Sequence, residues 1–206
     1  MIFRTGDRKD FSQCLSVLIS AFENYAFFNI YRAKEQHRFF ETMMKIWLDN
    51  SFRNGTVFVA EEHSEIVAAA VLQAPGDPEI DIVDFSHCES KTLIDLAGKE
   101  TLNAFLHMCE VSDKACHDLP DPKWYAVLMA VAARQEGKGI GSKMLQSALI
   151  PYIRKNGGGL LTFNTNAEVN LPFYHKNGFQ EFDVSVLHEN GVELGNWSYK
   201  KEIPQA

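Results

Sequence analysis

Three glycines occur at alternate positions, Gly137, Gly139 and Gly141, directly after an apolar stretch of the chain. Glycine has no Cβ and adopts positive φ readily, so successive backbone N–H groups in such a run can turn toward one anion. A helical pattern begins at Ile140 and would add the positive end of its dipole. Lys138 supplies a side-chain cation within the same turn. The run therefore predicts a phosphate-binding loop between a strand and a helix.

The spacing of this loop argues against two common nucleotide-binding motifs. A mononucleotide P-loop needs four residues between its first glycine and a Gly-Lys-Ser/Thr sequence, and the chain has no such spacing. A dinucleotide fingerprint needs a further glycine where Ser142 or Met144 stands. That fingerprint usually opens a domain, whereas this loop lies about two-thirds along the chain. A phosphate-bearing ligand of another kind is favoured.

The loop resembles the pattern Gln/Arg-x-x-Gly-x-Gly/Ala, the coenzyme A pyrophosphate loop of the GNAT superfamily of acyl-CoA-dependent N-acyltransferases. Residues 136–141 read Glu-Gly-Lys-Gly-Ile-Gly, and residues 170–179 read Asn-Leu-Pro-Phe-Tyr-His-Lys-Asn-Gly-Phe, which is similar to the family's Asn-x-x-x-Tyr-x-x-x-Gly-Phe segment. With the strands around them, the two motifs cover about residues 124–199. Glu136 departs from the pattern. Because a carboxylate cannot donate to phosphate, the backbone and Lys138 would make that contact.

The resemblance implies acetyl-CoA as the cofactor and a set of residues that hold it. The strand before the loop would pair with the pantetheine amides, and a backbone N–H at Val131 or a neighbour would donate to the thioester carbonyl oxygen. Tyr174 stands where the family carries its general acid, and a phenol is protonated at neutral pH. The expected cofactor contacts are Met129, Val131, Glu136, Gly137, Lys138, Gly139, Ile140, Gly141, Ser142 and Asn170.

The expected reaction is the direct attack of a primary amine, from a small molecule or a peptide, on the thioester. An amine with a pKa near 10.4 is about one part in 10³ neutral at pH 7, which costs about 4–5 kcal/mol unless a carboxylate or a water relay accepts its proton. Glu23 is one candidate base, and Tyr25 and Phe28 are candidates to line the acceptor site. A solvated carboxylate and core aromatic side chains remain the alternatives for these residues. Two other functions stay open: a different donor or an O-linked acceptor, and a non-catalytic acyl-CoA-binding sensor.

A mixed α/β sheet is expected to position these residues. Amphipathic patterns predict helices over 10–22, 34–50, 140–153 and 168–176, and the segment 90–118 is helix-prone with an interruption near Gly98. The expected fold is α/β (α+β) with a mostly antiparallel central sheet flanked by helices, in a single domain over residues 1–206 with a helical insertion at about 80–122. The resemblance implies that the strands at 124–133 and 160–165 splay apart. The remaining expected strands are 1–4, 56–61, 65–73, 179–187 and 193–200.

The composition limits the partners of the chain. Its 206 residues carry a formal net charge of −7, which disfavours nucleic acid, although the loop region 134–143 has three basic residues and one acidic residue. The longest apolar run is ten residues, too short to span a membrane, and the first ten residues contain no apolar signal core. A cytoplasmic monomer or homodimer is expected. The four cysteines, Cys14, Cys88, Cys109 and Cys116, lack the spacing of a zinc site, so no metal is expected.

Overall fold

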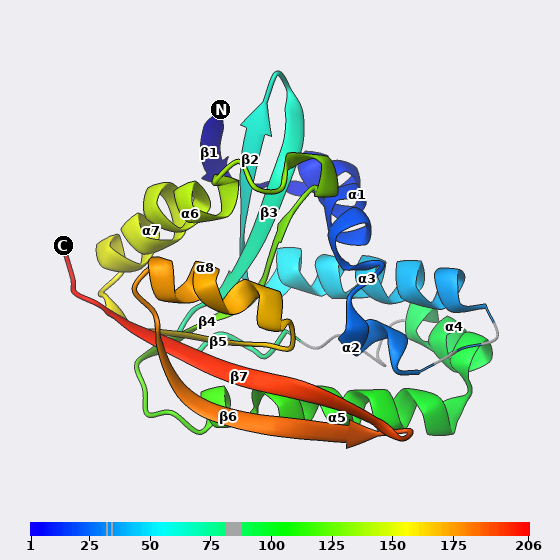
Figure 1. The fold of residues 1–206 in the computed structure, drawn as a ribbon. Helices are drawn as coiled ribbons and strands as arrows, with labels where there is room; N and C mark the ends of the chain where they lie inside the picture. The colour runs from blue at the N-terminus through cyan, green and yellow to red at the C-terminus, as the bar shows by residue number, and fades with distance from the viewer. Residues whose placement is uncertain (32, 34, 81–87) are drawn as a thin grey trace.

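The computed structural model describes all of residues 1–206 except 32, 34 and 81–87, and part of the expected insertion therefore lies outside the described residues. Within the described part, seven strands form one sheet in the order β1-β2-β3-β4-β5-β7-β6 (Figure 1). Every neighbouring pair is antiparallel except β4 and β5, which are parallel. The strands are β1 Ile2–Thr5, β2 Thr56–Glu62, β3 Glu65–Gln73, β4 Lys123–Val131, β5 Gly159–Thr165, β6 Gln180–Glu189 and β7 Val192–Ile203.

Helices cover both faces of this sheet. One buried group of apolar side chains packs α1 to α5 against one face, and a second packs the helical segment after β4 against the other. The predicted mixed sheet flanked by helices is confirmed. The helices are α1 Phe11–Phe22, α2 Ala26–Asn29, α3 Gln36–Asn54, α4 Cys88–Ala97, α5 Lys99–His117, α6 Ile140–Met144, α7 Ile150–Lys155 and α8 Leu171–Lys176.

The central strand β3 shows why the sheet needs helices on both sides. Its residues alternate between the two cores: Ala69 and Val71 face the first, and Ala68, Ala70 and Leu72 face the second. All five side chains are fully buried. Successive residues of a strand point to opposite faces, so a strand this apolar is stable only between two packed layers.

The helical segment after β4 departs from the expected regular helix. A π-helical segment, Leu145–Leu149, separates α6 from α7, and Pro151 lies in the first turn of α7. Proline has no N–H to donate to the preceding turn, and a π turn accommodates such a break. The helix expected over 140–153 is therefore interrupted at its centre.

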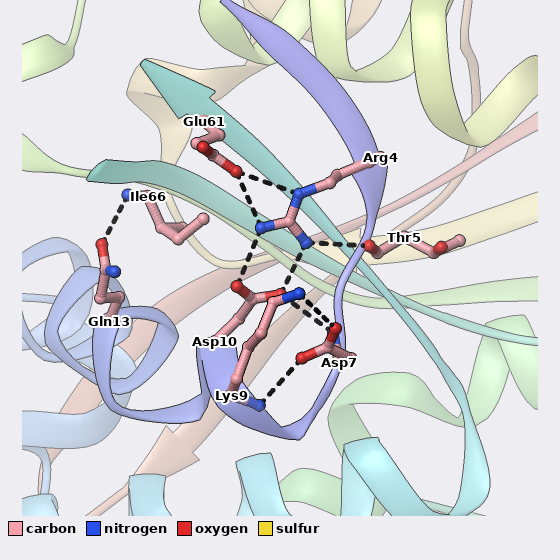
Figure 2. A network of polar contacts seen from close by, with 8 residues as sticks. All are labelled: Arg4, Thr5, Asp7, Lys9, Asp10, Gln13, Glu61 and Ile66. Carbon is pink, nitrogen blue, oxygen red and sulfur yellow. Dashed lines mark hydrogen bonds and ion pairs between the residues drawn. The ribbon is translucent and has the colours of Figure 1, made fainter. Parts of the chain in front are cut away.

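An ion-pair network fixes α1 on the sheet (Figure 2). Arg4 of β1 donates two hydrogen bonds to the carboxylate of Asp10, at 2.7 and 2.9 Å, and two to Glu61 of β2, at 2.8 and 3.1 Å. The hydrogen bonds from Arg4 lower the pKa of Asp10 to about 2. One turn on, the Gln13 side chain accepts a bond from the N–H of Ile66 at the start of β3. The start of α1 is thus held, and its far end leads into an aromatic segment at the candidate site.

Candidate active site

The strands β4 and β5 pair over only three residue pairs, from Lys123↔Leu160 to Tyr125↔Thr162. Beyond these pairs, β4 continues to Val131 and β5 to Thr165 without pairing with each other. On its other edge β4 stays paired with β3, but its register shifts so that Val127 is an extra, bulged residue. A bulge bends the strand that carries it. The predicted splay between β4 and β5 is therefore present, and Figure 1 shows the two strands diverging.

The splay leaves one backbone edge of β4 facing the gap. The N–H of Ala132 donates to the carbonyl of Val67, at 2.9 Å, on the β3 side. Backbone groups of alternate residues in a strand point to opposite edges. The N–H and C=O groups of Met129 and Val131 consequently point away from β3, into the gap. An extended ligand entering there could pair with them as an added strand does.

A pocket of about 170 Å³ occupies the gap and passes between the strands from one face of the sheet to the other. Met129 and the predicted residues Asn170 and Tyr174 line it on the side of the glycine loop. Tyr25 and Phe28 line it on the side of α1 and α2. The structure thus brings together five of the residues expected at the donor and acceptor sites: Met129, Asn170, Tyr174, Tyr25 and Phe28. Val131 is not among the lining residues, and its backbone alone borders the gap.

Tyr174 lies on α8 with its ring inside an aromatic cluster. Its ring centroid is 4.5 Å from that of Phe163 and 5.1 Å from that of Tyr199. Burial raises the pKa of Tyr174 well above the ordinary value of 10, and a hydrogen bond with Thr165 opposes this only in part. The phenol therefore keeps its proton at any physiological pH. A partly buried, protonated phenol at the wall of a pocket can donate a proton to a leaving group.

The glycine loop has the geometry of an anion site. Gly137 and Gly139 both have φ of 74°, and no atom lies within 4 Å of the position a Cβ would take at either residue. Gly139 precedes the first residue of α6, so the first N–H groups of that helix have no helical partner. The side chain of Ile140 is buried, which leaves its backbone N–H as its only possible contact with an anion. This geometry fits a diphosphate.

The polar side chains of the loop are held in different ways. Lys138 is exposed and donates to Gln135 Oε1 at 2.6 Å, and Glu136 is exposed as well. The hydroxyl oxygen of Ser142 accepts from Asn177 Nδ2 at 3.0 Å, which ties the start of α6 to the end of α8. A Cβ at Gly141 would come within 3.2 Å of the Phe173 ring, also on α8. The loop and the helix that carries Tyr174 are therefore packed directly together.

The predicted acceptor residues divide into two groups. The hydroxyl of Tyr25 accepts from the N–H of Asn166 at 2.8 Å and lies 3.4 Å from Thr165 Oγ1, so α1 and α2 are fixed to the end of β5. Phe28 is buried beside it, with ring centroids 5.8 Å apart. Glu23 is exposed, 3.8 Å from His37 Nδ1, and is not among the residues that line the pocket. The structure does not bring this carboxylate to the site.

Helix α5 contributes side chains to the pocket that the sequence analysis did not find. Cys109, Ser112 and Asp113 all line it. The pattern that could have indicated this face is the spacing of 109, 112, 113 and 116, which lie on one side of a helix. Asp113 also pairs with His117, 3.5 Å away on the next turn, and this hydrogen bond raises the pKa of His117.

A buried polar network attaches α5 to the far strands of the sheet. Asn196 of β7 accepts hydrogen bonds from Ser112 Oγ at 3.1 Å, from Asn164 Nδ2 at 3.2 Å and from Asn166 Nδ2 at 3.0 Å, and its own amide donates to the Ser112 carbonyl at 2.9 Å. Tyr125 of β4 donates to Asn164 Oδ1 at 2.8 Å. The network therefore crosses the open end of the splay. It fixes the pocket wall on the acceptor side.

The described residues offer neither a metal site nor a membrane-spanning helix. No group of three or more His, Cys, Asp or Glu side chains in this part of the chain could hold a metal ion. No helix in it is long and apolar enough to cross a membrane. Cys14, Cys109 and Cys116 are free thiols, and burial raises the pKa of each. The side chain of Cys88 lies outside the described residues.

Comparisons with known proteins agree with this geometry. Residues 98–181 match the family model of the acetyltransferase (GNAT) domain, a range that includes α5, β4, the glycine loop and α8. A comparison with curated proteins finds no match. Among solved structures, the chain is similar to histone acetyltransferase HPA2 and related acetyltransferase of Corynebacterium glutamicum, with 18% identity, a TM-score of 0.67, and coverage of 99% of this chain and 96% of that one.

Two further solved structures show the same fold. The ribosomal-protein-S18-alanine N-acetyltransferase of Escherichia coli has 12% identity and a TM-score of 0.60, with 100% of this chain and 95% of that chain covered. The ribosomal-protein-alanine N-acetyltransferase of Brucella melitensis has 20% identity and a TM-score of 0.59, with 98% and 99% covered. At these identities the likeness concerns the fold. Together with the match of residues 98–181 to the family model, it agrees with the resemblance drawn from the two motifs: this part of the chain matches the acetyltransferase (GNAT) domain, and the chain as a whole has the fold of these acetyltransferases.

Proposed function

We propose that the protein transfers an acetyl group from acetyl-CoA to a primary amine, of a small molecule or a peptide, by direct attack of the amine. The observation that carries this proposal is the pocket between β4 and β5. It joins the side of the glycine loop to the aromatic segment of α1 and α2, and Tyr174 stands at its wall. One continuous space can thus hold a thioester and an amine together.

The residues of the loop and of β4 fit coenzyme A. The backbone N–H groups from Gly137 to Ser142 would hold the diphosphate, because the positive φ of two glycines and the start of α6 leave them free to turn toward an anion. The free edge of β4 at Met129 and Val131 would pair with the pantetheine amides. Coenzyme A supplies, when bound, an acyl group activated as a thioester. Glu136 is exposed and can turn to solvent, so its carboxylate does not prevent this contact.

Two groups of the chain would then act on the reacting atoms. The N–H of Val131 would donate to the carbonyl oxygen as it gains negative charge. Tyr174 would give its proton to the departing thiolate, and water would take the proton that the amine loses as the amide forms. The bulge at Val127 sets the direction of the strand that carries the first of these donors. No side chain of the chain needs to become covalently attached to the acyl group.

The test is thiol release from acetyl-CoA in the presence of a panel of primary amines. Tyr174→Phe should lower kcat by about 10²–10⁴ and leave the affinity for coenzyme A within about twofold, because only proton donation is removed. Tyr152→Phe is the matched control, since Tyr152 does not line the pocket and its hydroxyl is hydrogen-bonded to Thr56 of β2, so the change should leave kcat unaltered. Tight binding of coenzyme A without turnover of any amine would indicate a sensor instead. Unchanged turnover in Tyr174→Phe would remove the role assigned to Tyr174.

We place this activity in the cytoplasm, with the protein as a monomer or a homodimer. Cys14, Cys109 and Cys116 are unpaired thiols, a state that is typical of a reducing compartment. Cell fractionation and light scattering of the purified protein test these two points.

A further inference from the structure

The pocket has one negatively charged group, and it comes from α5. Among the described residues that line the pocket, Asp113 supplies the only carboxylate. The other polar side chains there that belong to the Asn196 network, Ser112, Asn164 and Asn166, are already hydrogen-bonded to one another or to Asn196. None of them carries a charge, so their attraction for a cation is weaker than that of a carboxylate. Asp113 is therefore the group of this pocket that is best suited to a positively charged ligand.

Asp113 also lies where the pocket meets a second, outer cavity of about 690 Å³. The two spaces share five lining residues, and Asp113 is the only one of these that carries a charge: Trp47, Cys109, Asp113, Tyr125 and Val127. Among the described residues, the outer cavity is also lined by three further carboxylates, those of Glu79, Glu110 and Asp118. Its basic side chains are those of Lys114 and His117. A molecule entering from this side passes an acidic surface and meets Asp113 at the entrance to the pocket.

The contacts of Asp113 leave room for such a ligand. Among the described residues, Asp113 forms an ion pair with His117 Nε2 at 3.5 Å, and about 31% of the Asp113 side chain stays exposed. A carboxylate has about four sites that accept hydrogen bonds, so one imidazole does not saturate it. The His117 ring packs on Tyr125, with centroids 4.8 Å apart, which places the imidazole on the outer side of the boundary.

We propose that Asp113 binds the ammonium group of the acceptor, and that the acceptor is an alkyl primary amine carrying a positive charge in solution. This inference rests on the proposed function and specifies the substrate class of the same pocket. The role of Asp113 is to select the acceptor by charge. In this view α5 is the helix that sets acceptor specificity, and the aromatic side chains of α1 and α2 enclose the alkyl part.

The first test measures binding without turnover. The probe is n-butylammonium, titrated by calorimetry or by NMR into the protein saturated with coenzyme A. Asp113→Asn should weaken its binding about 10- to 100-fold, because a charge-assisted hydrogen bond is replaced by a neutral one. Glu100→Gln is the control, since it removes one exposed negative charge from the other end of α5, and should change binding less than about twofold. His117→Gln should bind the probe at least as tightly as the unmodified protein, because Asp113 loses a competing partner.

The second test compares two acceptors in the acetyl-transfer assay. Asp113→Asn should raise KM for n-butylamine about 10- to 100-fold, and should leave KM for acetyl-CoA and for aniline, which is neutral at pH 7, within about threefold. A general loss of structure would affect all three values and the thermal unfolding curve. Equal effects on the charged and the neutral amine, or no binding of n-butylammonium by the unmodified protein, would overturn the inference.

The two proposals fail separately. Binding of the probe that depends on Asp113, without turnover of any amine, would keep this inference and overturn the proposed transfer reaction. Turnover of amines that is indifferent to Asp113→Asn would keep the reaction and overturn the role of Asp113.

Discussion

Replacing Gly139 by alanine separates the cost of backbone strain from the cost of a lost ligand contact. Gly139 has φ of 74°, a conformation that costs other residues about 1–2 kcal/mol. No atom lies within 4 Å of the position its Cβ would take, so Gly139→Ala adds strain without a clash in the free protein. For a chain of this length, such a loss corresponds to a fall in Tm of about 2–8 °C.

The added methyl group should weaken the binding of coenzyme A by more than backbone strain alone explains. In our account, the space in front of Gly139 is where the diphosphate lies, so the Cβ pushes the phosphate away from the N–H groups. We expect Kd for coenzyme A to rise at least about tenfold, which corresponds to about 1.4 kcal/mol. Strain that is equal in the free and the bound protein does not change Kd.

The chain offers a matched control in Gly191, in the turn between β6 and β7. Its φ is also 74°, and no atom lies within 4 Å of its Cβ position. Gly191→Ala should therefore lower Tm by about the same amount and leave the affinity for coenzyme A unchanged. Thermal unfolding and isothermal titration with coenzyme A measure the two effects. Equal affinities in the two variants would refute the phosphate-binding role of the loop.

The remaining predictions concern pH and the polar networks. The pKa of Asp10 is lowered from 3.8 to about 2, so its pair with Arg4 adds about 2 kcal/mol to the free energy of unfolding above about pH 4. This contribution is lost as the pH falls to about 2. Urea unfolding should show the loss in the unmodified protein and not in Asp10→Asn. Asn196→Ala should lower the free energy of unfolding by about 1–3 kcal/mol, because it removes the hydrogen bonds of the buried Asn196 side chain with Ser112, Asn164 and Asn166. The exposed Asn103→Ala should cost much less. Because burial raises the pKa of Tyr174, kcat should show no loss from ionisation of the phenol up to about pH 10. A fall in kcat at a lower alkaline pH that occurs in the unmodified protein but not in Tyr174→Phe would contradict the assignment.

The elements of the sheet and the loop could be predicted because their signals are local. The glycines at 137, 139 and 141 and the following helical pattern are contiguous, and the structure places the turn and the helix start there. Asn-Gly is a typical hairpin turn, and the structure places Asn190 and Gly191 between β6 and β7, where strands were expected over 179–187 and 193–200. The splay of β4 and β5 followed from the resemblance, and the pairing of these strands shows it.

The acceptor side of the pocket could not be predicted because its contacts are remote in sequence. Ser112 and Asn196, which are hydrogen-bonded, are 84 residues apart, and nothing in the sequence near α5 indicates that partner. The helical spacing gives the face of α5, but only the packed structure shows that Asp113 reaches the pocket. For Glu23 the structure favours the alternative of a solvated carboxylate: it lies next to the aromatic segment in sequence, yet its side chain is exposed and lies near His37.

The most direct test of the account is a crystal structure of the protein with coenzyme A bound. The account predicts that the diphosphate contacts the N–H groups between Gly137 and Ser142, that the pantetheine pairs with the backbone of Met129 and Val131 between the splayed strands, and that the sulfur lies within hydrogen-bond distance of the Tyr174 hydroxyl. Coenzyme A bound outside the gap between β4 and β5, or a sulfur remote from Tyr174, would contradict it.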